Sequence, residues 1–160
     1  MNVIIDKETR FTEIYERFGD GVYKFILSMI GDYDDSNDIF QNVFTKIYEK
    51  IESLNDERNV KSYIFTITKN KTLDYLKSRK SHTIDIESAK ELCTQDPDIN
   101  LLLDLNKAVE TLFPREKEIF EMKYFFGYKI IEIANILNIS EGAVKRYLFD
   151  ATYKIRDILK

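Results

Sequence analysis

Few side chains in this 160-residue sequence are suited to covalent chemistry. It contains one cysteine, Cys93, and one histidine, His82, so neither an internal disulfide nor a cysteine–histidine metal cluster can form. No serine–histidine or cysteine–histidine pair is indicated, and no glycine-rich phosphate loop is present. Asp34, Asp35 and Asp38 are an alternative metal cluster, but acids at a helix start more often cap the helix and interact with its dipole. We therefore expect no enzyme activity, no metal and no cofactor.

One group of residues combines positive charge with aromatic rings. Residues 69–80 carry five lysines and arginines against one aspartate, and Tyr63, Phe65 and Tyr75 belong to the same expected helix. Cations that follow a phosphate backbone, beside rings that stack on bases, suit single-stranded or melting DNA. The alternative is that the charges form a solvated helix face and Tyr63 lies in the core.

A second group, between Ile130 and Leu148, has the spacing of a helix-turn-helix. Ala134 is small where a second helix must approach closely. Asn138, four residues later, adopts positive φ more readily than most residues, and Val144 follows where it would hold the second helix on the core. The alternative is a helical hairpin packed on another element.

The outward residues at the start of that second helix are Ser140 as the N-cap, Glu141, Gly142, Lys145 and Arg146. This end of a recognition helix enters the major groove, where lysine and arginine can read guanine edges and helix amides can hold phosphate. The pattern predicts a DNA-reading surface.

The elements that must position these residues are helices. The sequence has only five glycines and two prolines, apolar residues recur at helical spacing, and strand-like alternation is absent. The stripes predict four helices in the first unit, over residues 11–18, 22–30, 39–51 and 60–76, with Gly19 and Gly21 breaking the first pair. In the second unit they predict helices over 101–112, from Pro114 towards Gly127, over 130–137, and from Ser140 to about residue 158. The expected fold class is all-α.

Charge divides the chain into two small helical domains. Residues 1–85 carry 13 bases against 15 acids, residues 86–105 one base against five acids, and residues 106–160 ten bases against eight acids. We therefore expect a helical bundle over 1–82, an acidic linker over 83–105, and a helix-turn-helix domain over 106–160. The alternative is an acidic loop within one domain.

The whole chain carries a net charge of −4, and it has no apolar run long enough to cross a bilayer. Its first ten residues lack the basic start and apolar stretch of an export signal. We expect a cytoplasmic protein without membrane insertion, monomeric when free, with weak DNA affinity of its own.

Together these motifs resemble bacterial RNA polymerase sigma factors of the two-domain, extracytoplasmic-function type. The resemblance covers residues 11–156 and rests on the order of Asp38-Ile-Phe-Gln-Asn-Val-Phe44, Tyr63-Ile-Phe-Thr-Ile-Thr-Lys-Asn70 and Asp74-Tyr-Leu-Lys77, followed by Leu112-Phe-Pro-Arg-Glu-Lys-Glu-Ile-Phe120, Gly127-Tyr-Lys-Ile-Ile-Glu-Ile-Ala134 and Ile139-Ser-Glu-Gly-Ala-Val144. It implies a non-catalytic subunit that directs core RNA polymerase to promoter DNA and helps to open it. It also implies that an anti-sigma factor is a candidate partner.

The resemblance assigns three sets of site residues. Contact with the clamp helices of the polymerase's largest subunit falls to Asp38, Gln41 and Phe44. Contact with the minus-ten promoter element falls to Asn55, Tyr63, Lys69, Asn70, Asp74 and Lys77. Contact with the minus-thirty-five element falls to Ser140, Glu141, Gly142, Lys145 and Arg146.

The chain departs from the family where Asp150 and Thr152 replace arginines common on the recognition helix, which should weaken its hold on phosphate. The competing function is a stand-alone helix-turn-helix regulator that binds an operator. Such a regulator needs neither the segment from Asp38 to Phe44 nor the basic and aromatic helix, so both segments count against it.

Overall fold

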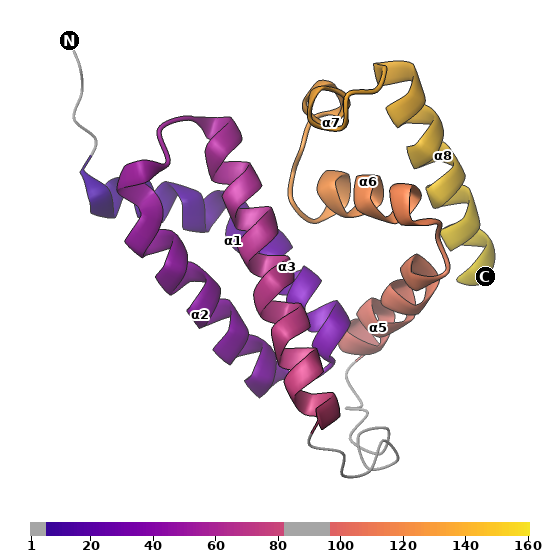
Figure 1. The fold of residues 1–160 in the computed structure, drawn as a ribbon. Coiled ribbons are helices and arrows are strands. Elements are labelled where there is room, and N and C mark those ends of the chain that lie inside the picture. Colours follow the sequence, from indigo (N-terminus) through magenta and orange to yellow (C-terminus); the bar gives the residue numbers. More distant parts are fainter. Residues whose placement is uncertain (1–5, 82–96) are drawn as a thin grey trace.

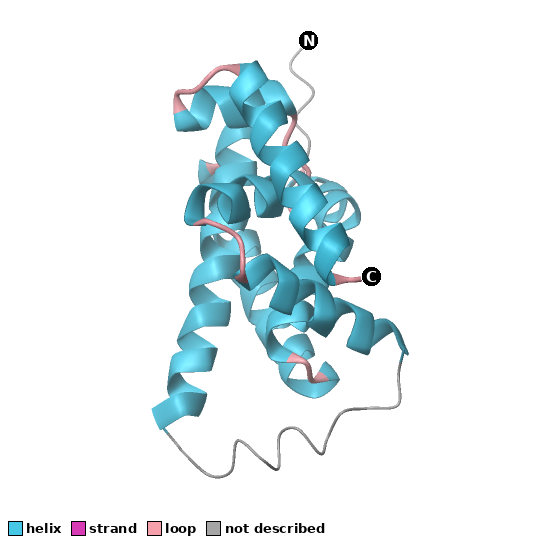
Figure 2. Cartoon of the chain, turned by 90° about the vertical axis from the view of Figure 1, so that its right-hand side faces the viewer, coloured by secondary structure: helices cyan, strands magenta, loops and turns pink. Residues whose placement is uncertain are grey.

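The computed structural model describes residues 6–81 and 97–160 (Figure 1). Every regular element in these two ranges is a helix, and neither range contains a strand (Figure 2). The prediction of an all-α fold is confirmed.

The first unit consists of three α-helices and a short 3₁₀ turn. These are α1 (Lys7–Ile30), α2 (Tyr33–Lys50), η1 (Ile51–Ser53) and α3 (Glu57–Ser81). The side chain of Asp6 caps the start of α1 by accepting a hydrogen bond from the Thr9 amide, and Gly31 ends it with a left-handed φ of 75°. Asp32 then caps α2 by accepting from the Asp35 amide. These caps explain why the chain turns sharply between α1 and α2.

The expected break at Gly19 and Gly21 is wrong, because α1 runs through both residues. A glycine inside a helix costs only about 1 kcal/mol relative to alanine, and a continuous α1 buries Ile14, Phe18 and Val22 along one stripe. The glycines serve packing instead. A Cβ at Gly19 would meet the ring of Phe40 at 3.8 Å, and one at Gly21 would overlap the carbonyl oxygen of Phe125 in the second unit.

The second unit consists of α5 (Pro97–Glu110), α6 (Pro114–Tyr124), α7 (Ile130–Leu137) and α8 (Glu141–Ile158). Residues 97–105, assigned above to the linker, are therefore helical. Ile99 is completely buried, and Leu103 packs on Gly31 at the end of α1, so this segment has an apolar face despite its acidic composition. Residues 83–96 of the expected linker lie outside the described residues.

The two units lie side by side and share a hydrophobic core (Figure 1). Among the described residues, four aromatic pairs cross between them: Phe25 with Phe125 and with Phe126, at ring-centroid distances of 5.5 and 5.2 Å, and Phe65 with Phe126 and with Tyr128, at 4.9 and 6.3 Å. A smaller second core of Ala108, Val109, Leu112, Phe120, Ala151 and Ile155 lies within the second unit alone. The units are thus packed against each other as well as joined in sequence.

Candidate nucleic-acid interface and partner-binding surface

The helix-turn-helix is formed by α7 and α8, and its turn has the predicted geometry. Asn138 adopts a left-handed conformation with φ 54° and ψ 48°, and its amide donates to the carbonyl of Ala134. The Ser140 hydroxyl caps α8 by accepting from the Ala143 amide at 3.0 Å. Val144 is completely buried. The sequence therefore predicted this motif correctly, and the first turns of α8 are fixed relative to α7.

The outward face of α8 contains the predicted DNA-reading residues. Glu141, Gly142, Lys145 and Arg146 are all exposed. Sequence reasoning missed Phe149 and Tyr153, whose side chains are 71% and 67% exposed. They follow Lys145 at intervals of four residues, and that spacing was the available signal. The face that Lys145 begins is therefore aromatic as well as basic.

Four predicted minus-ten residues fall on one face of α3. Tyr63, Asn70, Asp74 and Lys77 follow helical spacing, and the last three are exposed. Tyr63 is half-buried, its hydroxyl donates to the carbonyl of Lys46 at 3.5 Å, and burial raises the pKa of its phenol. The structure therefore brings these four side chains together on one face, although Tyr63 presents only part of its ring.

Lys69 does not belong to that face. Its ammonium donates to Glu121 Oε2 of α6 at 2.8 Å and lies 5.1 Å from the centre of the Phe65 ring. The Glu121 side chain is only 4% exposed. Burial raises the pKa of the Glu121 carboxyl, and the hydrogen bond from Lys69 opposes that rise without cancelling it. The structure thus pairs Lys69 with the second unit.

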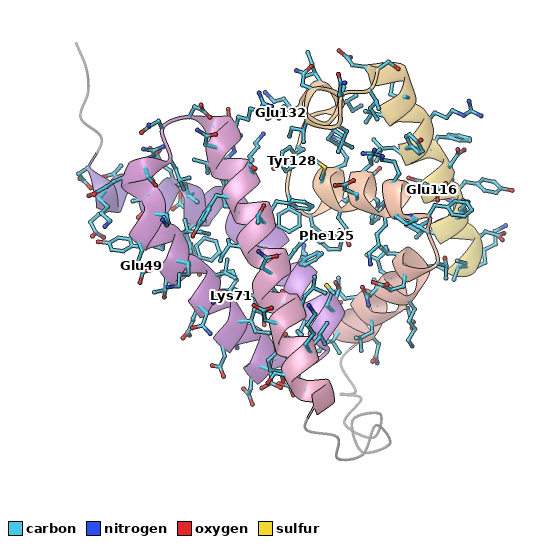
Figure 3. The ribbon with its side chains drawn as sticks, in the orientation of Figure 1. Glu49, Lys71, Glu116, Phe125, Tyr128 and Glu132 are labelled. Carbon is cyan, nitrogen blue, oxygen red and sulfur yellow. The ribbon has the colours of Figure 1, made fainter. Side chains whose placement is uncertain are left out.

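A second lysine of α3 makes a similar contact. Lys61 is 1% exposed and donates to Glu132 Oε1 of α7 at 2.7 Å. Burial acts to raise the pKa of the Glu132 carboxyl, but hydrogen bonds from Lys61 and from the Lys129 amide outweigh it, so that pKa lies below its ordinary value. Figure 3 shows Glu132, Tyr128 and Phe125 between α3 and the rest of the second unit. Two ion pairs therefore join α3 to the helices it faces.

Asn55 lies apart from the other predicted minus-ten residues. It is exposed in the loop before α3 and lines a pocket of about 280 Å³ whose wall includes Arg10, Arg17 and Glu57. Arg10 donates to the carbonyl of Leu54, and Arg17 is paired with Glu57. The other five predicted minus-ten residues do not line this pocket.

An aromatic groove of about 640 Å³ runs between α1 and α2. Its lining consists of Glu8, Phe11, Tyr15, Asn37, Phe40, Gln41, Phe44, Thr45 and Tyr48. Of the three predicted polymerase-binding residues, Gln41 is exposed and lines the groove, whereas Asp38 is exposed beside it. Phe44 is only 4% exposed and packs edge-on against Phe11, so its main role is in the core.

One of the acids singled out at the start of α2, Asp35, has a structural partner. The hydroxyl of Tyr75 donates to Asp35, and burial together with that bond raises the pKa of Tyr75 to about 12. No group of three histidine, cysteine or acidic side chains among residues 6–81 and 97–160 is placed to hold a metal. Within the same ranges, none of the helices has the length and apolar character required to cross a membrane.

Comparison with known proteins identifies the family. Residues 14–82 match the family described as Sigma-70 region 2, and residues 102–155 match Sigma-70, region 4. The chain is 30% identical over 150 residues to the ECF RNA polymerase sigma factor SigM of Bacillus subtilis (strain 168), which covers 90% of this chain and 91% of SigM. The chain belongs to the ECF family of RNA polymerase sigma factors.

One further relative and two solved structures resemble this sigma factor. It is 24% identical over 166 residues to the ECF RNA polymerase sigma factor SigW of Bacillus subtilis (strain 168), covering 94% of this chain and 89% of SigW. Its structure resembles CnrH in complex with the cytosolic domain of CnrY, with a TM-score of 0.60 and 19% identity over 93% of this chain and 86% of that one. It also resembles the sigma factor RpoE in complex with the anti-sigma factor NepR from Bartonella quintana, with a TM-score of 0.58 and 19% identity over 93% and 96% of the two chains.

Proposed function

We propose that this sigma factor binds core RNA polymerase in the cytoplasm, directs it to a subset of promoters and helps to open them. The observation that carries this proposal is the combination, in one chain, of a helix-turn-helix with an exposed basic face and a separate aromatic groove beside exposed Asp38 and Gln41. A stand-alone operator regulator needs the first surface and not the second. The polymerase, and not this chain, would form the phosphodiester bonds.

Polymerase binding is assigned to α2. A carboxylate and an amide that are both exposed on one amphipathic helix can meet arginine side chains of a partner helix, with which carboxylates form strong, charge-assisted hydrogen bonds. The neighbouring rings of Phe11, Tyr15 and Phe40 give this surface an apolar component. We expect Asp38 and Gln41 to contact the polymerase directly, while Phe44 supports them from the core.

Promoter contact is assigned to two helices. Lys145 and Arg146 of α8 would read the minus-thirty-five element, with Ser140, Glu141 and Gly142 fixing the start of the helix at the groove. Tyr63, Asn70, Asp74 and Lys77 of α3 would contact the minus-ten element, where opening the duplex costs a few kcal/mol and capture of an unpaired base offsets part of it. Asn55 would approach the same strand from the preceding loop. Lys69 can contribute only after its pair with Glu121 has been broken.

An anti-sigma factor is a reasonable second partner. Two proteins of the same fold are known in complexes, one with an anti-sigma factor, and the aromatic groove is an exposed surface of the kind that partner helices cover. We propose that such a partner competes with the polymerase for this groove.

Run-off transcription tests the proposed function. Purified core polymerase would transcribe fragments of the source genome with and without this protein, and we expect new start sites that require it. Replacing Lys145 and Arg146 with alanine should reduce transcription from those starts while leaving polymerase binding near normal. Replacing Asp38 and Gln41 with alanine should first weaken the polymerase complex.

The other outcomes have distinct meanings. Tight polymerase binding without new starts would indicate a polymerase-binding inhibitor. Operator binding with neither new starts nor polymerase binding would favour the stand-alone regulator.

A further inference from the structure

Lys69 lies on the face of α3 that meets the second unit, and the proposed function would use it on DNA only after its ion pair has been broken. Lys69 donates to Glu121 at 2.8 Å, and Glu121 is 4% exposed. The same interface contains the pair of Lys61 and Glu132 and the contact of Phe65 with Phe126. In this arrangement, a carboxylate of the second unit neutralises the Lys69 ammonium.

This closed arrangement is too short to reach both promoter elements at once. Elements named for positions minus ten and minus thirty-five are about 25 base pairs apart, or roughly 85 Å of duplex at about 34 Å per ten base pairs. A compact chain of this length has a radius of gyration of about 15 Å, and hence a diameter near 40 Å. The two units must therefore separate before α3 and α8 can contact their elements together.

We propose that Lys69 and Glu121 form an ion-pair switch that keeps the two units closed until nucleic acid captures Lys69. A nearly buried carboxylate is destabilising unless a cation neutralises it or it takes up a proton, and either the buried charge or the proton uptake costs free energy. A phosphate strand along α3 competes for Lys69 and leaves Glu121 buried without that cation. The closed state is then disfavoured, and the units separate. The link to promoter DNA rests on the proposed function, whereas closure by the pair is a property of the free chain.

The pair differs from the other ion pair of the same interface. Lys61 is 1% exposed, so a DNA strand cannot reach it without prior separation of the units. The Lys69 side chain is 28% exposed, so a competing anion can approach this side chain from solvent while the units are closed. Lys69 is therefore the position at which nucleic acid can begin to open the molecule.

Energy transfer between dyes on the two units tests the proposal in the full-length protein. Dyes would be attached at Glu49→Cys on α2 and Asp157→Cys on α8, both exposed positions, in a background carrying Cys93→Ser. Lys69→Met leaves Glu121 without its cation, and we expect transfer efficiency to fall by at least a third. Lys69→Met combined with Glu121→Leu replaces the pair by apolar side chains, and we expect the closed value to return.

The nucleic-acid part is tested with a single-stranded DNA of about 20 nucleotides, long enough to follow a basic face. It should lower the transfer efficiency of the wild type and leave that of the double variant unchanged. Lys154→Met is the matched control, because Lys154 pairs at 2.9 Å with Glu116, a carboxylate that is 7% exposed within the second unit alone. This variant should remain closed, and thermal unfolding monitored by circular dichroism confirms that each variant folds.

Two results would overturn the proposal: unchanged transfer in the Lys69→Met variant, or an equal response of the wild type and the double variant to DNA. A normal switch together with a failed run-off experiment would reject the proposed function and retain closure by the pair. New start sites together with unchanged transfer in the Lys69→Met variant would support the proposed function and reject closure by the pair.

Discussion

Phe149 gives the most specific prediction of how this protein recognises bases of the minus-thirty-five element. It is 71% exposed, and it lies one helical turn beyond Lys145 on the outward face of α8. An apolar ring in the major groove has one natural partner on a base edge, the C5-methyl group of thymine. Phe149 would therefore contribute to base selection, while the lysine and arginine beside it also hold the backbone.

We expect Phe149→Ala to remove a preference for thymine at one position of the minus-thirty-five element. Burying a methyl group is worth about 0.8 kcal/mol, or roughly a fourfold change in affinity. Replacing each thymine in turn by deoxyuridine should thus weaken the wild-type protein about fourfold at one position and leave the variant unaffected there. Fluorescence anisotropy with short duplexes would measure this effect.

The control for this experiment is Leu101→Ala, which removes an exposed apolar side chain from α5. It should respond to deoxyuridine as the wild type does. Equal sensitivity of the Phe149→Ala variant and the wild type would show that the ring does not touch a thymine methyl.

At the scale of single residues, the sequence predicted which side chains are exposed better than it predicted which groups they contact. Lys145 and Arg146 are exposed as expected, because a helical pattern identifies the apolar side and leaves the rest outward. The partner of Lys69 is Glu121, 52 positions away in the chain, and local spacing contains no information about such a contact. Phe44 was assigned to the polymerase contact from the family resemblance, and its side chain lies in the core instead of at the surface.

At the scale of elements, caps and turns explain why the helix-turn-helix was predictable. Asn138 must adopt positive φ, which costs other residues with a Cβ about 1–2 kcal/mol. Ser140 supplies the oxygen that the first turn of α8 requires. These requirements are local, so they are visible in the sequence. The break expected at Gly19 and Gly21 failed for a non-local reason, since tertiary packing of α1 outweighs a weak local preference.

The turn of the helix-turn-helix gives a direct test at this scale. We expect Asn138→Ala to lower the free energy of unfolding by about 1 kcal/mol, because alanine adopts the left-handed conformation poorly. Asn138→Gly should stay within a few tenths of a kcal/mol of the wild type, because glycine adopts it freely. Thermal or urea unfolding would measure both. A loss in the glycine variant as large as in the alanine variant would show that the Asn138 side chain, and not its backbone, stabilises the turn.

At the scale of the whole molecule, the packing of the two units depends on a close approach at Gly21. A Cβ there would overlap the carbonyl oxygen of Phe125, whereas a Cβ at Gly19 would make an ordinary contact with Phe40. Both glycines lie inside the same helix, so alanine at either position should favour that helix by up to about 1 kcal/mol. Any difference between the two variants therefore reports on the interface between the units.

We expect Gly19→Ala to keep or raise the free energy of unfolding and to leave the two units closed. Gly21→Ala should retain the helicity of α1 but separate the units, which would raise the radius of gyration measured by small-angle X-ray scattering. If both variants scatter alike, the contact between α1 and Phe125 does not hold the units together.

The aromatic pairs between the units have a consequence for the lifetime of this protein in a cell. Separation of the units uncovers the rings of Phe25, Phe65, Phe125 and Phe126, and a contiguous apolar surface of this kind invites aggregation and capture by proteases and chaperones. We expect an open molecule that finds no polymerase to be removed, and one that is bound to polymerase to survive. The steady-state abundance of this protein would then follow the supply of free polymerase. Variants that open too readily would show a lower abundance in the cell before they showed a loss of activity in transcription.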